Sequence, residues 1–61
     1  MNVFKEFDRM SRYWASIIDT EENLTQEQIS GAKKCLHNAV TWDADRSADR
    51  IAEALNRRGI E

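Results

Sequence analysis

The chain has 61 residues, a formal net charge of −2, 41% hydrophobic and 33% charged residues, no proline and two glycines. This composition is typical of one small helical domain over residues 1–61 and excludes a disordered or β-rich chain. One cysteine and one histidine exclude an internal disulfide and a Cys₂His₂ or Cys₄ zinc site.

The slightly acidic charge balance disfavours nucleic acid as the primary ligand, because proteins that bind free nucleic acid usually carry a basic surplus. No apolar run approaches the roughly 20 residues of a transmembrane helix. Glu6 and Asp8 lie where a signal peptide would be apolar. We therefore expect a soluble, cytoplasmic protein with no membrane partner.

Apolar residues recur at intervals of four and three residues in the first part of the chain: Val3, Phe7, Met10, Trp14 and Ile17. This spacing is typical of one face of an amphipathic helix. It predicts a first helix from about residue 3 to 19, with Asp8 and Arg12 as a surface pair. The polar stretch 19–23 then predicts a turn.

A second helix is predicted from about residue 25 to 41. Thr25 and Gln28 fit a capping box, and Leu24 and Ile29 fit the hydrophobic staple around it. Gly31 lowers helix stability by about 1 kcal/mol relative to alanine. It is either an exposed, tolerated glycine or a site where two helices cross closely. The apolar face of this helix follows the helical period: Ile29, Ala32, Leu36, Ala39 and Val40.

A third helix is predicted from about residue 43 to 58. Acidic residues in its first turn and basic residues in its last suit a separate helix dipole. Gly59 fits the left-handed position after the helix, where Ile60 would contact Leu55 in a Schellman motif. Its apolar face again follows the helical period: Ala44, Ala48, Ile51 and Leu55.

Whether the second and third helices are separate is left open by the sequence. Residues 41–45 contain no glycine, proline or capping box, and Ile29, Val40 and Ile51 are spaced by eleven, as one continuous helix would have them. A break or sharp kink is favoured because Asp43 and Asp45 suit a new helix start.

The predicted fold is therefore an all-α bundle of three helices, the last two being separate, kinked or continuous. So few large side chains predict a homodimer rather than a monomer. The residues predicted for the core or the dimer contact are the large apolar ones of the three stripes: Phe7, Met10, Trp14, Ile17, Ile29, Leu36, Val40, Ile51 and Leu55.

Catalysis finds little support in the sequence. His37 is predicted to be a plain surface or half-buried histidine, and Cys35 a small apolar filler. The carboxylates of residues 43–53 alternate with arginines, and pairs such as Glu53–Arg57 suit a solvated face rather than a cation site. We expect no catalytic residue, no metal, no cofactor and no enzyme activity.

Two aromatic residues are candidates for anchoring a partner. Trp42 lies at the predicted junction of the second and third helices, where it either covers the end of the bundle or stays partly exposed. Tyr13 lies off the main stripe of the first helix. Tryptophan and arginine are enriched in binding hot spots, so Arg46 and Arg50 are further candidates.

The segment from Ser47 to Ile60, with Ile51, Ala52, Leu55 and Gly59 in the pattern Ile-Ala…Leu…Gly-Ile, resembles a segment of large serine recombinases and other helix-turn-helix proteins. The resemblance implies the first helix and turn of a DNA-binding motif, whose second, reading helix would begin at about Glu61. The short, charged, proline-free helical chain as a whole resembles the small accessory proteins of temperate, lambdoid phages. That resemblance implies a non-enzymatic protein that binds a host or phage protein.

The leading hypothesis is a small helical protein that self-associates and acts by protein–protein contact with a partner still to be identified. The alternative is a nucleic-acid-associated regulator that contacts phosphates through the arginines of its last third: Arg46, Arg50, Arg57 and Arg58.

Overall fold

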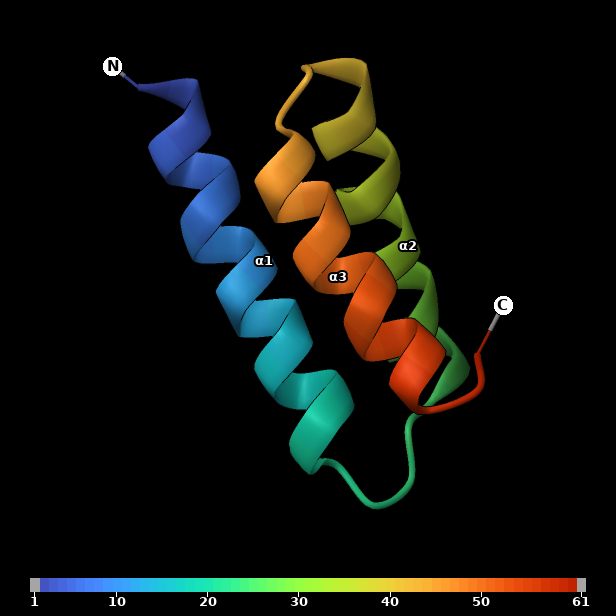
Figure 1. Cartoon of the computed structure of the whole chain (residues 1–61). Helices are drawn as coiled ribbons and strands as arrows, with labels where there is room; N and C mark the ends of the chain where they lie inside the picture. The colour runs from blue at the N-terminus through green and yellow to red at the C-terminus, as the bar shows by residue number, and fades with distance from the viewer. Residues whose placement is uncertain (1, 61) are drawn as a thin grey trace.

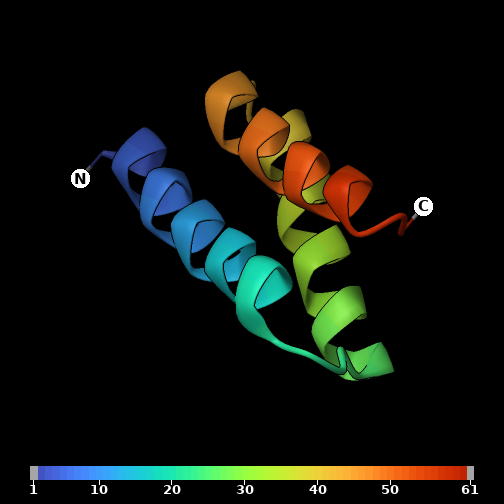
Figure 2. The ribbon, with the colours of Figure 1, turned by 60° about the horizontal axis from the view of Figure 1, so that its bottom comes forward.

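The computed structural model describes residues 2–60, which form three helices: α1 (Val3–Thr20), α2 (Gln26–Thr41) and α3 (Asp45–Arg57). The chain runs along α1, back along α2 and forward again along α3, so α1 and α3 are parallel and α2 is antiparallel to both (Figure 1). Each helix packs against the other two (Figure 2). The predicted all-α bundle of three helices is confirmed.

Side chains fix the starts of the first two helices. The Asn2 Oδ1 atom accepts hydrogen bonds from the backbone N–H groups of Phe4 and Lys5, at 3.0 and 3.3 Å, a cap that the sequence analysis did not identify. At α2 the predicted capping box is confirmed. The Gln28 N–H donates to Thr25 Oγ1 at 3.1 Å, and the Thr25 N–H donates to Gln28 Oε1 at 2.9 Å.

A Schellman motif separates α2 from α3. The Ala44 N–H donates to the Ala39 carbonyl at 2.7 Å, and the Asp43 N–H donates to the Val40 carbonyl at 3.1 Å. Asp43 has a φ of 57°, in the left-handed region. The break is confirmed, and a continuous helix is wrong. The third helix begins at Asp45, two residues later than predicted, because Asp43 and Ala44 complete this motif.

The end of α3 has the same geometry. Gly59 has a φ of 71°, and its N–H donates to the Asn56 carbonyl at 3.0 Å. The Ile60 N–H donates to the Leu55 carbonyl at 2.9 Å. The Schellman motif predicted at this position is confirmed.

The core is built largely from small side chains. Ile18 and Ile51 are the large apolar side chains that are almost completely buried, at 1% and 0% exposure. Alanines make up more than half of the buried apolar residues in the described part of the chain: Ala15, Ala32, Ala39, Ala44, Ala48 and Ala54. Small side chains let helix backbones approach closely, but each buries little apolar area.

The predicted apolar residues divide into three groups by exposure. Those buried within the single chain are Phe7, Ile51 and Leu55. Those partly buried are Trp14, Ile17, Ile29 and Leu36. Those exposed are Met10 and Val40.

The core-facing side of α1 is therefore rotated from the predicted stripe, toward Phe7, Ser11, Ala15 and Ile18. The physical reason lies at Ser11, a polar residue that an apolar pattern passes over. Its hydroxyl is satisfied inside the bundle, because it donates to the Asp8 carbonyl and accepts a hydrogen bond from Arg50 of α3.

Candidate functional site

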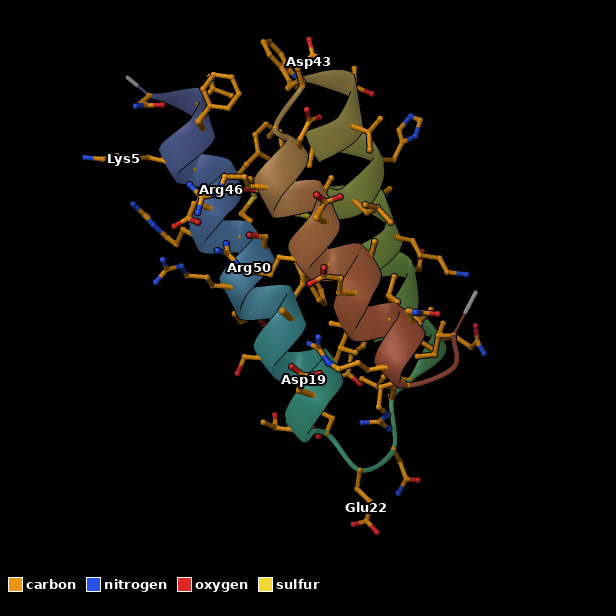
Figure 3. All side chains as sticks on the ribbon, viewed as in Figure 1. Lys5, Asp19, Glu22, Asp43, Arg46 and Arg50 are labelled. Carbon is orange, nitrogen blue, oxygen red and sulfur yellow. The ribbon has the colours of Figure 1, made fainter. Side chains whose placement is uncertain are left out.

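Arginines form a stripe on the side of α3 that faces α1. Arg46, Arg50 and Arg57 are separated by four and seven residues, so they lie on one flank of the helix. In Figure 3, the labelled Arg46 and Arg50 extend from α3 toward α1. Because α1 and α3 are parallel, successive arginines meet successive levels of α1 (Figure 1).

Arg50 is held at the middle level of the stripe. Its Nη1 atom lies 2.7 Å from Asp8 Oδ1 and 2.9 Å from the hydroxyl of Ser11, which is fully buried. Asp8 also pairs with Arg12 at 3.1 Å, as the sequence predicted. The hydrogen bond from Arg50, with the nearby charges of Arg12 and Arg46, holds the pKa of Asp8 below its ordinary value of 3.8, although desolvation opposes the shift.

The last two arginines bind the end of α1. Arg57 pairs with Asp19 through Nη2 at 2.9 Å, and not with Glu53 as the sequence suggested. Arg58 donates to the carbonyls of Ile18 and Glu21, at 2.7 and 2.6 Å. These carbonyls belong to the C-terminal end of α1, where helix carbonyls lack partners within the helix. The last turn of α1 itself contains no basic residue, so α3 supplies the cation that the helix dipole favours there.

Arg46 differs from Arg50 and Arg57, because it takes part in no ion pair among residues 2–60. It lines a cleft of about 520 Å³ between the first turns of α1 and α3. We call this the α1–α3 cleft, and its lining residues come from both helices and from the turn before α3: Asn2, Phe4, Lys5, Asp8, Arg12, Asp43, Ala44, Asp45, Arg46, Ser47 and Arg50.

Exposed aromatic side chains lie at the same end of the bundle as the cleft. Phe4 lines the cleft and is 57% exposed. Trp42, at 59% exposure, precedes Asp43 in the turn between α2 and α3, at the end of the bundle where α1 begins (Figure 3). Trp42 therefore does not cover the end of the bundle. It stays exposed, as the partner-anchor interpretation requires.

Tyr13, the other aromatic candidate, is exposed on the side of α1. Its ring packs edge-on against Trp14, with the centroids 5.2 Å apart and the planes at 79°. This contact is an ordinary aromatic pair, and Tyr13 does not line the α1–α3 cleft.

A second, shallower depression of about 420 Å³ lies between α2 and α3. It is lined by three apolar residues, Leu36, Val40 and Leu55, and two polar ones, Lys33 and His37. Its lining contains no phenylalanine, tyrosine, tryptophan or arginine, so it offers fewer of the groups that anchor a partner.

The histidine and the cysteine, the two side chains considered for catalysis, differ in their exposure to solvent. His37 is exposed, whereas Cys35 is buried in the core, where desolvation raises the pKa of its thiol. Within residues 2–60 no three His, Cys, Asp or Glu side chains gather closely enough to hold a metal ion. The same residues contain no helix both long and apolar enough to cross a membrane.

The sequence matches no protein-family model and no curated protein, and the fold matches no solved structure. The resemblances to serine recombinases and to phage accessory proteins therefore gain no support from known proteins. In this chain, Ile51 and Leu55 of the recombinase-like segment are buried in the three-helix core. Glu61, where a reading helix would begin, lies outside the described residues.

The amino-acid sequence alone does not predict contacts between helices for Phe4, Asp8 or Ser11. Asp8 was assigned only to its local pair with Arg12, since a contact with Arg50, 42 residues away, leaves no periodic signal. The hint of such a contact is Ser11, the polar residue on the buried side of α1 that otherwise consists of Phe7, Ala15 and Ile18.

Proposed function

We propose that this protein acts without catalysis, by binding another protein at the end of the bundle that carries the α1–α3 cleft. The observation that carries the proposal is the grouping of Phe4, Trp42 and Arg46 at this end. Phe4 and Arg46 line the concave surface, and Trp42 immediately precedes Asp43, which also lines it. Both aromatic side chains are exposed, and Arg46 forms no ion pair among residues 2–60. Tryptophan, tyrosine and arginine anchor interfaces more often than other residues.

The rest of the bundle offers a useful comparison. Single exposed apolar residues are normal on soluble proteins and need no partner to explain them. Val40 is of this kind, since it is exposed and does not line the α1–α3 cleft. The cleft end is where aromatic area, positive charge and concavity coincide.

The partner suggested by the resemblance to phage accessory proteins, a host or phage protein, is part of this proposal and rests on that resemblance alone. The alternative, a nucleic-acid-associated regulator, needs Arg46, Arg50, Arg57 and Arg58 free to contact phosphates. Three of these four arginines are bound to α1, which weakens the alternative. Salt-dependent binding to duplex DNA would restore it, with a steep slope of log K against log salt.

Photo-crosslinking in cells of the source organism tests the proposal. Benzoylphenylalanine replaces Trp42 in one variant, and Arg9, exposed on the opposite side of α1 from Phe7 and Ile18, in the control. We expect one discrete crosslinked protein from position 42 and none from position 9. Equal adducts from both positions, or none from position 42, would contradict a docking role for this end of the bundle.

A further inference from the structure

The stripe of arginines on α3 is matched by carboxylates of α1 at two of its three levels. Asp8 holds Arg50, and Asp19 holds Arg57. Arg46 lies one helical turn before Arg50, at the level where α1 begins (Figure 3). The residues of α1 that line the cleft at this level are Phe4 and Lys5. Asp8 of α1 also lines the cleft and feels the charge of Arg46, but it forms its ion pairs with Arg12 and Arg50 and leaves Arg46 without one.

The charges around Arg46 leave a cationic surplus on the α1 side of the cleft. Asp8 is already shared by Arg12 and Arg50, and it is the carboxylate that α1 contributes to the lining. Asp43 and Asp45, the other carboxylates of the lining, belong to the turn and the first residue of α3. Figure 3 shows Asp43 at the tip of the turn, away from Arg46.

Besides this positive charge, the start of α3 offers hydrogen-bond donors to a ligand. Its N-cap residue, Ala44, makes no side-chain cap, unlike Asn2 at α1 and Thr25 at α2. The first N–H groups of a helix have no partner within the helix, and the dipole gives them partial positive charge. Ser47, only 5% exposed, also lines the cleft and offers a hydroxyl.

We infer that the α1–α3 cleft binds an acidic peptide segment of a protein partner, with one carboxylate on Arg46 and an adjoining apolar side chain against Phe4. The inference deepens the proposed function and rests on it. Charge complementarity favours a carboxylate, because a carboxylate of the partner would pair with Arg46 as Asp8 pairs with Arg50 and Asp19 pairs with Arg57. The exposed Phe4 ring in the lining favours a peptide over a free phosphate, and the net charge of −2 disfavours a nucleic acid.

Amide chemical shifts of the ¹⁵N-labelled protein provide the test. The probe is an acetylated, amidated hexapeptide of alternating glutamate and leucine, titrated to about 5 mM, a range suited to weak binding. We expect shifts at residues 3–8 and 42–50 that saturate and shrink as salt is added. Because a hydrogen bond to a charged group is typically worth about a factor of ten, Arg46→Gln is expected to raise the Kd about tenfold.

Two controls separate the site from general electrostatics. Arg9→Gln removes the same charge from an exposed position outside the cleft, and its Kd is expected to stay at the wild-type value. The same peptide with glutamine in place of glutamate is expected to produce no shifts. Equal weakening by both arginine variants would overturn the inference, as would the absence of any Arg46-dependent shift.

Two further probes separate the possible ligands. Inorganic phosphate and a single-stranded oligonucleotide are titrated under the same conditions, and tighter binding of either would overturn the choice of an acidic peptide. Crosslinking through position 42 without any response to the peptide would leave the proposed function standing and the inference refuted. A response to the peptide without crosslinking would refute the cellular function alone.

Discussion

The indole ring of Trp14 lies against the backbone of Gly31, so that a β-carbon placed on the glycine would be 2.5 Å from the ring. No real β-carbon tolerates such a distance. Gly31 therefore serves the packing of α1 against α2, and the interpretation as a merely tolerated glycine is wrong. The cost in helix propensity is offset by the contact with a large aromatic ring.

Replacing Gly31 with alanine is expected to displace Trp14. Overpacking costs typically about 1–3 kcal/mol, which outweighs the gain of about 1 kcal/mol in helix propensity. We expect a net loss of about 1 kcal/mol in the free energy of unfolding and a red-shifted Trp14 emission, measured in a Trp42→Phe background. The double variant Gly31→Ala/Trp14→Leu, which removes the ring, is expected to regain stability. No coupling between the two positions would contradict the packing role.

The capping box predicts the effect of Thr25→Ala. The Gln28 N–H loses its acceptor, and the free energy of unfolding is expected to fall by about 0.5–2 kcal/mol in urea denaturation. Thr20→Ala is the matched control, because the Thr20 hydroxyl donates to the Ser16 carbonyl within α1 and caps no helix start. Equal losses from the two variants would show that the box contributes nothing beyond an ordinary surface threonine.

The two Schellman motifs provide a reciprocal experiment. Asp43 adopts the left-handed conformation that costs a residue with a side chain about 1 kcal/mol more than glycine. Asp43→Gly is expected to raise the free energy of unfolding by about that amount, and Gly59→Asp to lower it similarly. A β-carbon on Gly59 would meet no atom within 4 Å, so the second effect is a backbone effect. Thermal midpoints that move in the same direction in both variants would contradict this account.

The periodic features of this fold could be predicted from the sequence, and the features between helices could not. The start of α2 at Thr25 and the end of α3 before Gly59 could be predicted, because each depends on residues close together in the sequence whose types are characteristic of the motif. The break between α2 and α3 was harder to predict, because Asp43 occupies the left-handed position of the Schellman motif, where glycine is usual. The contacts that define the candidate site depend on how α3 lies along α1. Arg50 is bound because Asp8 and Ser11 of α1 lie within hydrogen-bond distance of it, whereas Arg46, one turn earlier on α3, forms no ion pair among residues 2–60.

The Asp8–Arg50 pair predicts a dependence of stability on pH. Because the pKa of Asp8 is lowered in the folded protein, its charged form stabilises the fold above the ordinary value of 3.8, and this stabilisation disappears as the pH falls through the lowered pKa. Asp8→Asn is expected to be less stable than the wild type at pH 7. Urea denaturation at decreasing pH is expected to show the two curves converging as the pH falls through the lowered pKa of Asp8. A gap that stays constant with pH would mean that the pair contributes nothing.

The structure changes which residues are expected to form the contact of a dimer. Ile51 and Leu55 were expected to complete a dimer, but they are already buried within one chain. The exposed apolar residues of α1 provide an alternative, since Val3, Met10 and Tyr13 are spaced by seven and three residues on one flank of the helix.

We expect a dimer at micromolar concentration, joined through this flank of α1. The physical reason is the core, which contains many alanines and buries little apolar area for the number of residues that it orders. A shared helix face adds apolar area that the single chain lacks. Sedimentation velocity over a range of concentrations measures the state directly.

Met10→Asp and Val40→Asp form a matched pair for the test. Both residues are exposed, so either variant leaves the three-helix core intact, but Met10 lies on the predicted flank and Val40 lies on α2. Met10→Asp is expected to give a monomer, because each charge would be buried in the dimer contact, and Val40→Asp is expected to keep the dimer. A wild-type protein that sediments as a monomer at every concentration would refute the dimer, and loss of association in Val40→Asp alone would move the contact to the α2–α3 depression.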